Sequence, residues 1–84
     1  VQEVTPDADT ALARACEIAH TIADAAAPLG VQATLASAHR ARDEGDAAAV
    51  AMLRPEVSRL FGTADAAEGL QSFLERRSAE FTGR

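Results

Sequence analysis

The 84-residue sequence predicts an all-α chain in which four helices follow a short extended N-terminal segment. Two observations support this fold class. Alanine accounts for 21 of the 40 hydrophobic residues, and the larger apolar side chains recur at the three- and four-residue spacing of a helix. Proline, glycine and capping residues then divide the chain into four helical segments, which we take in order.

The N-terminal segment and the first helix are separated by a proline. Residues 1–4 alternate apolar and polar side chains, which is a strand pattern, yet so short a strand has nothing in this chain to pair with. We therefore interpret it as an extended segment taken from a larger sheet. The first helix is predicted over residues 9–27, with Asp9 or Thr10 as its N-cap. Its apolar positions are Leu12, Ala15, Ala19, Ile22, Ala23 and Ala26.

The second and third helices are separated by a glycine. The second is predicted over 31–43, and the third over 46–61 with Asp46 as its N-cap. Because proline removes a backbone donor and clashes with the preceding turn, Pro55 predicts a kink or a split near Arg54. The apolar stripes consist of Val31, Leu35 and Ala38 in the second helix and of Val50, Leu53, Val57, Leu60 and Phe61 in the third.

The fourth helix, predicted over 65–77, has the most complete set of helix signals. Asp65 and Glu68 are spaced like a capping box and make the first turn acidic. The basic pair Arg76 and Arg77 suits the negative end of the helix dipole. The apolar stripe of this helix consists of Ala66, Leu70, Phe73 and Leu74.

The composition limits what the chain can do alone. Only 18 side chains are Val, Ile, Leu, Met or Phe, and the single cysteine excludes an internal disulfide. We therefore expect the chain to self-associate or to bury its apolar helix faces against a partner. A net charge of −5 with no lysine argues against nucleic acid as that partner. No apolar run approaches the roughly 20 residues of a membrane span, and no signal peptide is recognisable, so we expect a soluble cytoplasmic protein without a membrane partner.

Three groups of residues could in principle carry chemistry. Cys16 and His20 are spaced to share a metal ion, but two ligands do not make a site, and a small thiol beside the apolar stripe is expected to pack there. His39 borders a charged face and has no nucleophile near it in sequence. The acidic residues of segment 43–46 are explained by a helix end and the next cap. We predict no catalytic residue and no metal site.

The chain resembles the C-terminal region of the crotonase superfamily, the enoyl-CoA hydratases and isomerases. The matching segments occur in the family's order and span essentially the whole chain. The most specific of them resembles the family's closing pattern F-x-T-x-D-x-x-E-G-x-x-x-F-x-E-[KR]-R-x-x-x-F. These segments are Val1–Pro6, Pro28–Thr34, Phe61–Arg77 and Phe81.

The resemblance implies that residues 1–84 form a single helical assembly module of a crotonase-like α/β spiral fold. In the family, an N-terminal spiral domain supplies the oxyanion hole and the acid–base glutamates. That domain is absent from this sequence, so the chain alone is expected to be catalytically incomplete and to bind no cofactor. The resemblance also implies oligomerisation as a trimer or a dimer of trimers, coverage of the active site, and a coenzyme A thioester of fatty acid metabolism as the parent enzyme's substrate.

Two positions match family residues that reach the coenzyme A of a neighbouring subunit. Phe73 would stack on the adenine, and Arg76 would bind a phosphate through its forked donors. Each has a simpler interpretation, because Phe73 shares an apolar stripe with Leu70 and Leu74, and Arg76 suits a helix end. We expect Leu70 and Leu74 to anchor the helix. Capping or close packing is expected of Asp65, Glu68 and Gly69, and a solvated position of Glu75.

Two functions from different classes remain open. The first is a C-terminal oligomerisation and site-covering module of an enoyl-CoA hydratase/isomerase-type lyase or isomerase. The second is a free-standing helical interaction domain without a substrate. The sequence leaves hydratase, isomerase and hydrolase activity of a parent enzyme equally open, together with its acyl-chain preference.

Overall fold

The structure is a computed structural model that describes residues 1–84, and it contains four α-helices and no strand. The predicted all-α class is therefore confirmed. Residues 1–5 precede the first helix without regular secondary structure, so the four-residue alternation does not form a strand here. The helices are α1 (Ala8–Ala25), α2 (Pro28–Glu44), α3 (Asp46–Phe61) and α4 (Ala64–Glu75).

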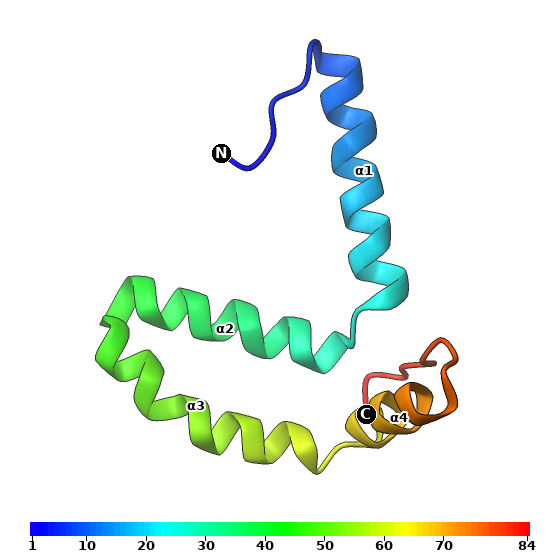
Figure 1. Ribbon diagram of the computed structural model, residues 1–84. Helices are drawn as coiled ribbons and strands as arrows, with labels where there is room; N and C mark the ends of the chain where they lie inside the picture. Colours follow the sequence, from blue (N-terminus) through cyan, green and yellow to red (C-terminus); the bar gives the residue numbers. More distant parts are fainter.

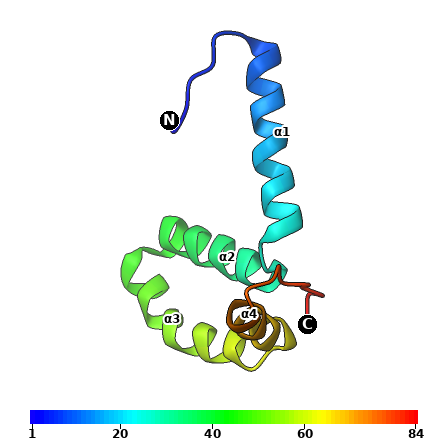
Figure 2. The ribbon, with the colours of Figure 1, turned by 45° about the vertical axis from the view of Figure 1, so that its right-hand side comes forward.

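The helices are unequally packed. Figures 1 and 2 show α2 and α3 as a helical hairpin, with α4 beside the open end of that hairpin. In both views α1 extends away from the other three helices, and it has no buried residue. The N-terminal segment is tied to α1 by an ion pair of 3.0 Å between Arg14 Nε and Glu3 Oε2.

The shape is more open than that of a globular domain. The Cα radius of gyration is 16.1 Å, whereas a compact domain of this length has one of about 12 Å. The accessible surface is 6705 Å², compared with about 4700 Å² for a globular monomer of this mass. Only four residues are buried, and they are Ala33, Ala49, Asp65 and Ser72. The expected shortage of core is therefore confirmed, and most large apolar side chains remain exposed.

The boundary between the first two helices differs from the prediction. Helix α1 was expected over 9–27 but starts one residue earlier, because Asp7 is its N-cap and accepts a backbone amide three residues on at 2.7 Å. Helix α2 was expected over 31–43 but starts at Pro28, which occupies the first helical turn, where a missing N–H has no consequence. The extended Ala27 before this proline forces the earlier end of α1.

The connection between α2 and α3 consists of one residue. Gly45, at φ 92°, is both the C-cap of α2 and the N-cap of α3, so the predicted capping role of Asp46 is wrong. Helix α3 has the predicted bounds and continues through Pro55 without splitting. Proline removes one backbone hydrogen bond, but the packing of α2 along α3 holds the helix together.

Helix α4 is shorter than its predicted range of 65–77. Its N-cap is Thr63, whose hydroxyl accepts the amide of Ala66 at 3.1 Å, so the expected capping box of Asp65 and Glu68 is not formed. The helix ends at Glu75, because the next residue adopts a left-handed conformation.

Candidate functional site

The end of α4 is closed by an unusual turn. Arg76 has φ 54° and ψ 45°, and it is the only residue other than glycine with a positive φ. Its amide donates to Phe73 O at 3.3 Å, and the amide of Arg77 donates to Ser72 O at 3.0 Å. This pair of bonds is the Schellman arrangement, in which the left-handed position is usually glycine. An arginine therefore occupies a position where a side chain is disfavoured.

The chain after this turn runs back along α4 and is bound by Asp65. The Asp65 carboxylate accepts three hydrogen bonds: from the Thr82 amide at 2.7 Å, from the Thr82 hydroxyl at 3.3 Å and from the Gly83 amide at 2.8 Å. The Asp65 amide donates in turn to Arg84 O at 2.8 Å. Asp65 is the most buried residue of the chain, at 3% exposed. The hydrogen bonds from Thr82 and Gly83 lower the pKa of this carboxyl.

A second carboxylate on α4 binds the turn itself. Glu68 receives two guanidinium contacts from Arg77, at 2.5 and 3.0 Å, and the amide of Glu80 at 2.8 Å. These donors lower the pKa of Glu68 to about 2. Arg77 also binds Glu75 at 2.5 Å and the carbonyl of Ser78 at 3.1 Å. We call the Glu68–Arg77 ion pair the clamp. Glu75, expected to be solvated, is half-exposed and takes part in this network.

Gly69 lies beside the returning chain. A Cβ at this position would lie 3.6 Å from Cε1 of Phe81, which is an ordinary van der Waals distance, so an alanine would also fit beside the ring. Phe81 packs near Gly69 as expected, but the packing does not require a glycine there. Asp65 and Glu68 do not cap α4 as expected, because both carboxylates bind the residues that follow the helix.

The two predicted site residues lie together on the open surface of this helix end. An open depression is lined by Ser72, Phe73, Leu74, Arg76 and Arg77. Phe73 is 79% exposed, so core packing within this chain is excluded for it. Leu70 and Leu74 are also exposed, so they anchor α4 against nothing within this chain, whose returning tail lies on the opposite, polar side of the helix.

The guanidinium of Arg76 is free to bind a ligand. It forms none of the seven ion pairs of the chain, whereas its neighbour Arg77 forms two. An exposed aromatic ring beside an unpaired arginine can stack on a planar base and bind an anionic group at the same time. The structure thus offers a surface of this chemistry at the predicted positions.

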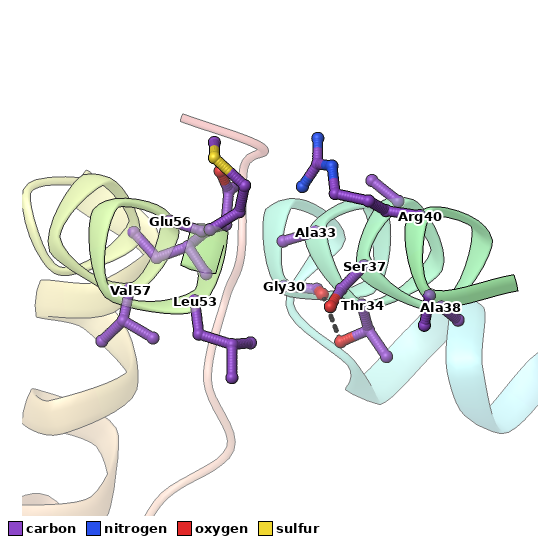
Figure 3. Close-up of a pocket in the computed structure, with 13 residues that line it drawn as sticks. Gly30, Ala33, Thr34, Ser37, Ala38, Arg40, Leu53, Glu56 and Val57 are labelled. Atoms are coloured by element: carbon purple, nitrogen blue, oxygen red, sulfur yellow. Dashed lines mark hydrogen bonds between the residues drawn. The ribbon is translucent and has the colours of Figure 1, made fainter. Parts of the chain in front are cut away.

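The sequence prediction missed a groove of about 550 Å³ between α2 and α3. Figure 3 shows small side chains of α2, such as Ala33 and Ser37, facing the longer Leu53 of α3. Arg40 of α2 and Glu56 of α3 lie at the same edge of this groove, one on each helix. The signal that could have revealed it is the helical spacing of small residues along α2. Those residues are Gly30, Ala33, Ser37 and Ala41.

The other sequence candidates do not come together. Cys16 is exposed, contrary to the packed position expected of it, because α1 covers nothing in this chain. His20 and His39 are exposed as well. The acidic segment 43–46 is explained in part by ion pairs with α2 arginines, such as Arg42 with Asp43 at 2.7 Å. No group of three or more metal-binding side chains is present, and no helix is long and apolar enough to cross a membrane.

Comparison with solved structures identifies a similar protein. The chain is similar to the crystal structure of a probable enoyl-CoA hydratase/isomerase from Mycobacterium abscessus, with 52% sequence identity and a TM-score of 0.89. The match covers 100% of this chain and 32% of that protein, so the chain spans about a third of its length. No protein-family model and no curated protein matches the chain. The resemblance and the helical fold expected from the sequence are both confirmed by this match.

Proposed function

We propose that this chain, which resembles the C-terminal region of the crotonase superfamily, is the assembly and site-covering element of an enoyl-CoA hydratase/isomerase-type enzyme. The observation that carries the proposal is the 52% identity over the whole chain to a protein described as a probable enoyl-CoA hydratase/isomerase. The proposal includes a domain organisation in which residues 1–84 are one helical module and the catalytic spiral is a separate part of the enzyme. The substrate class is an acyl-CoA thioester.

The open shape supports the assembly role. The surface is about 2000 Å² larger than a globular monomer of this mass requires, which is the area that a stable protein interface buries in total. The exposed apolar residues lie on α1, α3 and α4 alike. We propose that these faces pack against the rest of the enzyme and against neighbouring subunits, in a trimer or a dimer of trimers.

The depression at the end of α4 supports a role in binding coenzyme A. Phe73 presents its ring to solvent and can stack on adenine, while the unpaired Arg76 can bind a phosphate. We propose that these two residues bind the coenzyme A held by a neighbouring subunit. No acid, base or oxyanion hole of the reaction is assigned to this chain, so the 84 residues alone should not hydrate crotonyl-CoA.

Steady-state kinetics of the full-length enzyme test the coenzyme A contact. Phe73→Ala and Arg76→Ala should each raise KM for crotonyl-CoA by about tenfold, because a stacking or charge-assisted contact is lost. The value of kcat should change little, since neither residue touches the reacting carbons. Phe61→Ala and Arg54→Ala are matched controls, because Phe61 is equally exposed and Arg54 is equally unpaired, but both lie outside the depression.

The outcomes separate the two functions. An unchanged KM in both variants contradicts the coenzyme A contact, and an equal rise in the controls assigns the effect to assembly instead. A full-length protein that turns over no acyl-CoA thioester favours the alternative, a helical interaction domain without a substrate.

A further inference from the structure

The left-handed arginine at the end of α4 is a feature that the local sequence does not stabilise. Side chains disfavour this conformation because Cβ approaches the carbonyl oxygen, and glycine is the usual residue at this position. Arg76 nevertheless has φ 54° while its own side chain forms no ion pair. Strained backbone of this kind persists only where the surroundings hold it.

The surroundings that hold it belong to the next residue. Arg77 is fixed by four hydrogen bonds to its neighbours on either side of the turn: two to Glu68, one to Glu75 and one to the Ser78 carbonyl. The Glu80 amide binds the same Glu68 at 2.8 Å. The Arg77 side chain and the Glu80 backbone amide, which both follow the turn, therefore converge on one carboxylate of α4, and the backbone at the turn has little freedom.

Glu68 and the depression lie on different sides of α4. At about 100° per residue, Glu68 and Phe73 are separated by roughly 140° around the helix axis. Arg76 and Arg77 both line the depression beside Phe73, but only Arg77 also reaches across to Glu68. The two adjacent arginines therefore differ in their partners, because Arg77 is paired with Glu68 and Glu75 while Arg76 forms no ion pair.

We propose that Glu68 and Arg77 are positioning residues that hold Arg76 in its left-handed conformation and thereby place its guanidinium beside the Phe73 ring. The proposal rests on the coenzyme A contact described above. It adds that affinity for the phosphate depends on a carboxylate that touches no part of the ligand. Substitution of Glu68 should therefore weaken binding only while Arg76 is present.

A double-mutant cycle in the full-length enzyme tests this dependence. Glu68→Gln keeps an acceptor for the Glu80 amide but removes the charge that binds Arg77. We expect it to raise KM for crotonyl-CoA by about threefold with kcat unchanged, and to have no further effect once Arg76 is alanine. Glu56→Gln is the matched control, because Glu56 also binds an arginine, Arg59, but lies outside the depression at the end of α4.

A second measurement separates positioning from general destabilisation. Amide hydrogen exchange should show faster exchange at Arg76 and Arg77 in Glu68→Gln, while the amides of α2 and α3 stay protected. The proposal is overturned if Glu68→Gln leaves KM unchanged, or raises it by the same factor with and without Arg76. If instead Arg76→Ala itself has no effect on KM, the coenzyme A contact fails, and the exchange data still report whether the clamp holds the turn.

Discussion

Helices α1 and α4 differ in how their side chains are used. Helix α1 has 18 residues and a regular apolar stripe, yet none of its residues is buried. Helix α4 has 12 residues, and its two buried side chains, Asp65 and Ser72, are both polar. Within this chain, the apolar stripe of α1 packs against nothing, whereas the polar residues of α4 form the contacts that organise the structure.

The difference shows that the polar contacts of α4 find their partners within this chain, whereas the apolar face of α1 does not. The carboxylates of α4 bind residues 9 to 18 positions later in the sequence, so the chain itself supplies both partners. The apolar face of α1 has no complementary surface among the other helices. A helix with such a face is stabilised by tertiary packing rather than by propensity, so α1 requires a surface outside these 84 residues.

Among the substitutions that test this comparison, loss of the Asp65 carboxylate should have the largest effect, because it should release the returning tail. Asp65→Ala removes the acceptor of three hydrogen bonds from the returning tail, and bonds to a charged group are the stronger ones. We expect the amides of Thr82 and Gly83 to exchange at least about tenfold faster in the full-length protein. Asp43→Asn is the control, since this exposed carboxylate binds only its neighbour Arg42. Unchanged exchange at both amides would show that the tail is held by other contacts.

Acid should release the same tail in a defined pH range. The pKa of Glu68 falls from an ordinary 4.5 to about 2 in the folded chain, chiefly because Arg77 binds it. A carboxyl whose pKa is lowered by folding stabilises the structure fully above its ordinary pKa and loses that contribution as the pH falls. Protection of the Glu80 amide, corrected for the intrinsic exchange rate, should therefore decrease between about pH 4.5 and 2. Glu68→Gln should abolish this dependence, and protection that is already lost at pH 6 would contradict it.

Glycine at the left-handed turn should separate stability from binding. Arg76→Gly removes the conformational penalty at φ 54° and should stabilise the full-length protein by about 0.5–1 kcal/mol, after the greater flexibility of an unfolded glycine is included. The same variant should raise KM as Arg76→Ala does. Thermal unfolding and kinetics measure the two effects, with Arg76→Ala as the comparison that keeps the penalty. A destabilised glycine variant would show that the arginine side chain itself supports the turn.

The smallest effect is expected on α1. Ile22→Ser in the isolated 84-residue chain should change the free energy of unfolding by no more than about 0.5 kcal/mol, because exposed substitutions rarely exceed this value and Ile22 contacts no buried core. Denaturant unfolding followed by circular dichroism measures it. A loss above 1 kcal/mol would mean that α1 packs against the other helices or against a second copy.

Much of the fold could be predicted because its signals are local. Helix α3 has the predicted bounds, since glycines flank it and its apolar spacing is regular. The errors have local causes too, because Pro28 starts a helix that it was expected to precede, and Thr63 is the cap expected at Asp65. The site was harder to interpret. Phe73 and Arg76 could be singled out only through the family resemblance, and nothing in the spacing indicated that Phe73 is exposed.

By itself, the sequence determined that this chain is helical, short of core residues and similar to part of an enoyl-CoA hydratase/isomerase, because helix periodicity, composition and motif order are properties of the chain alone. Only the tertiary structure decided which residues meet. It turned the acidic residues of α4 from expected caps into ligands of the tail, and it separated the adjacent Arg76 and Arg77 into one free and one bound guanidinium. The reason is the left-handed conformation of Arg76 itself, which reverses the chain and places residues 77–84 beside residues 65–69.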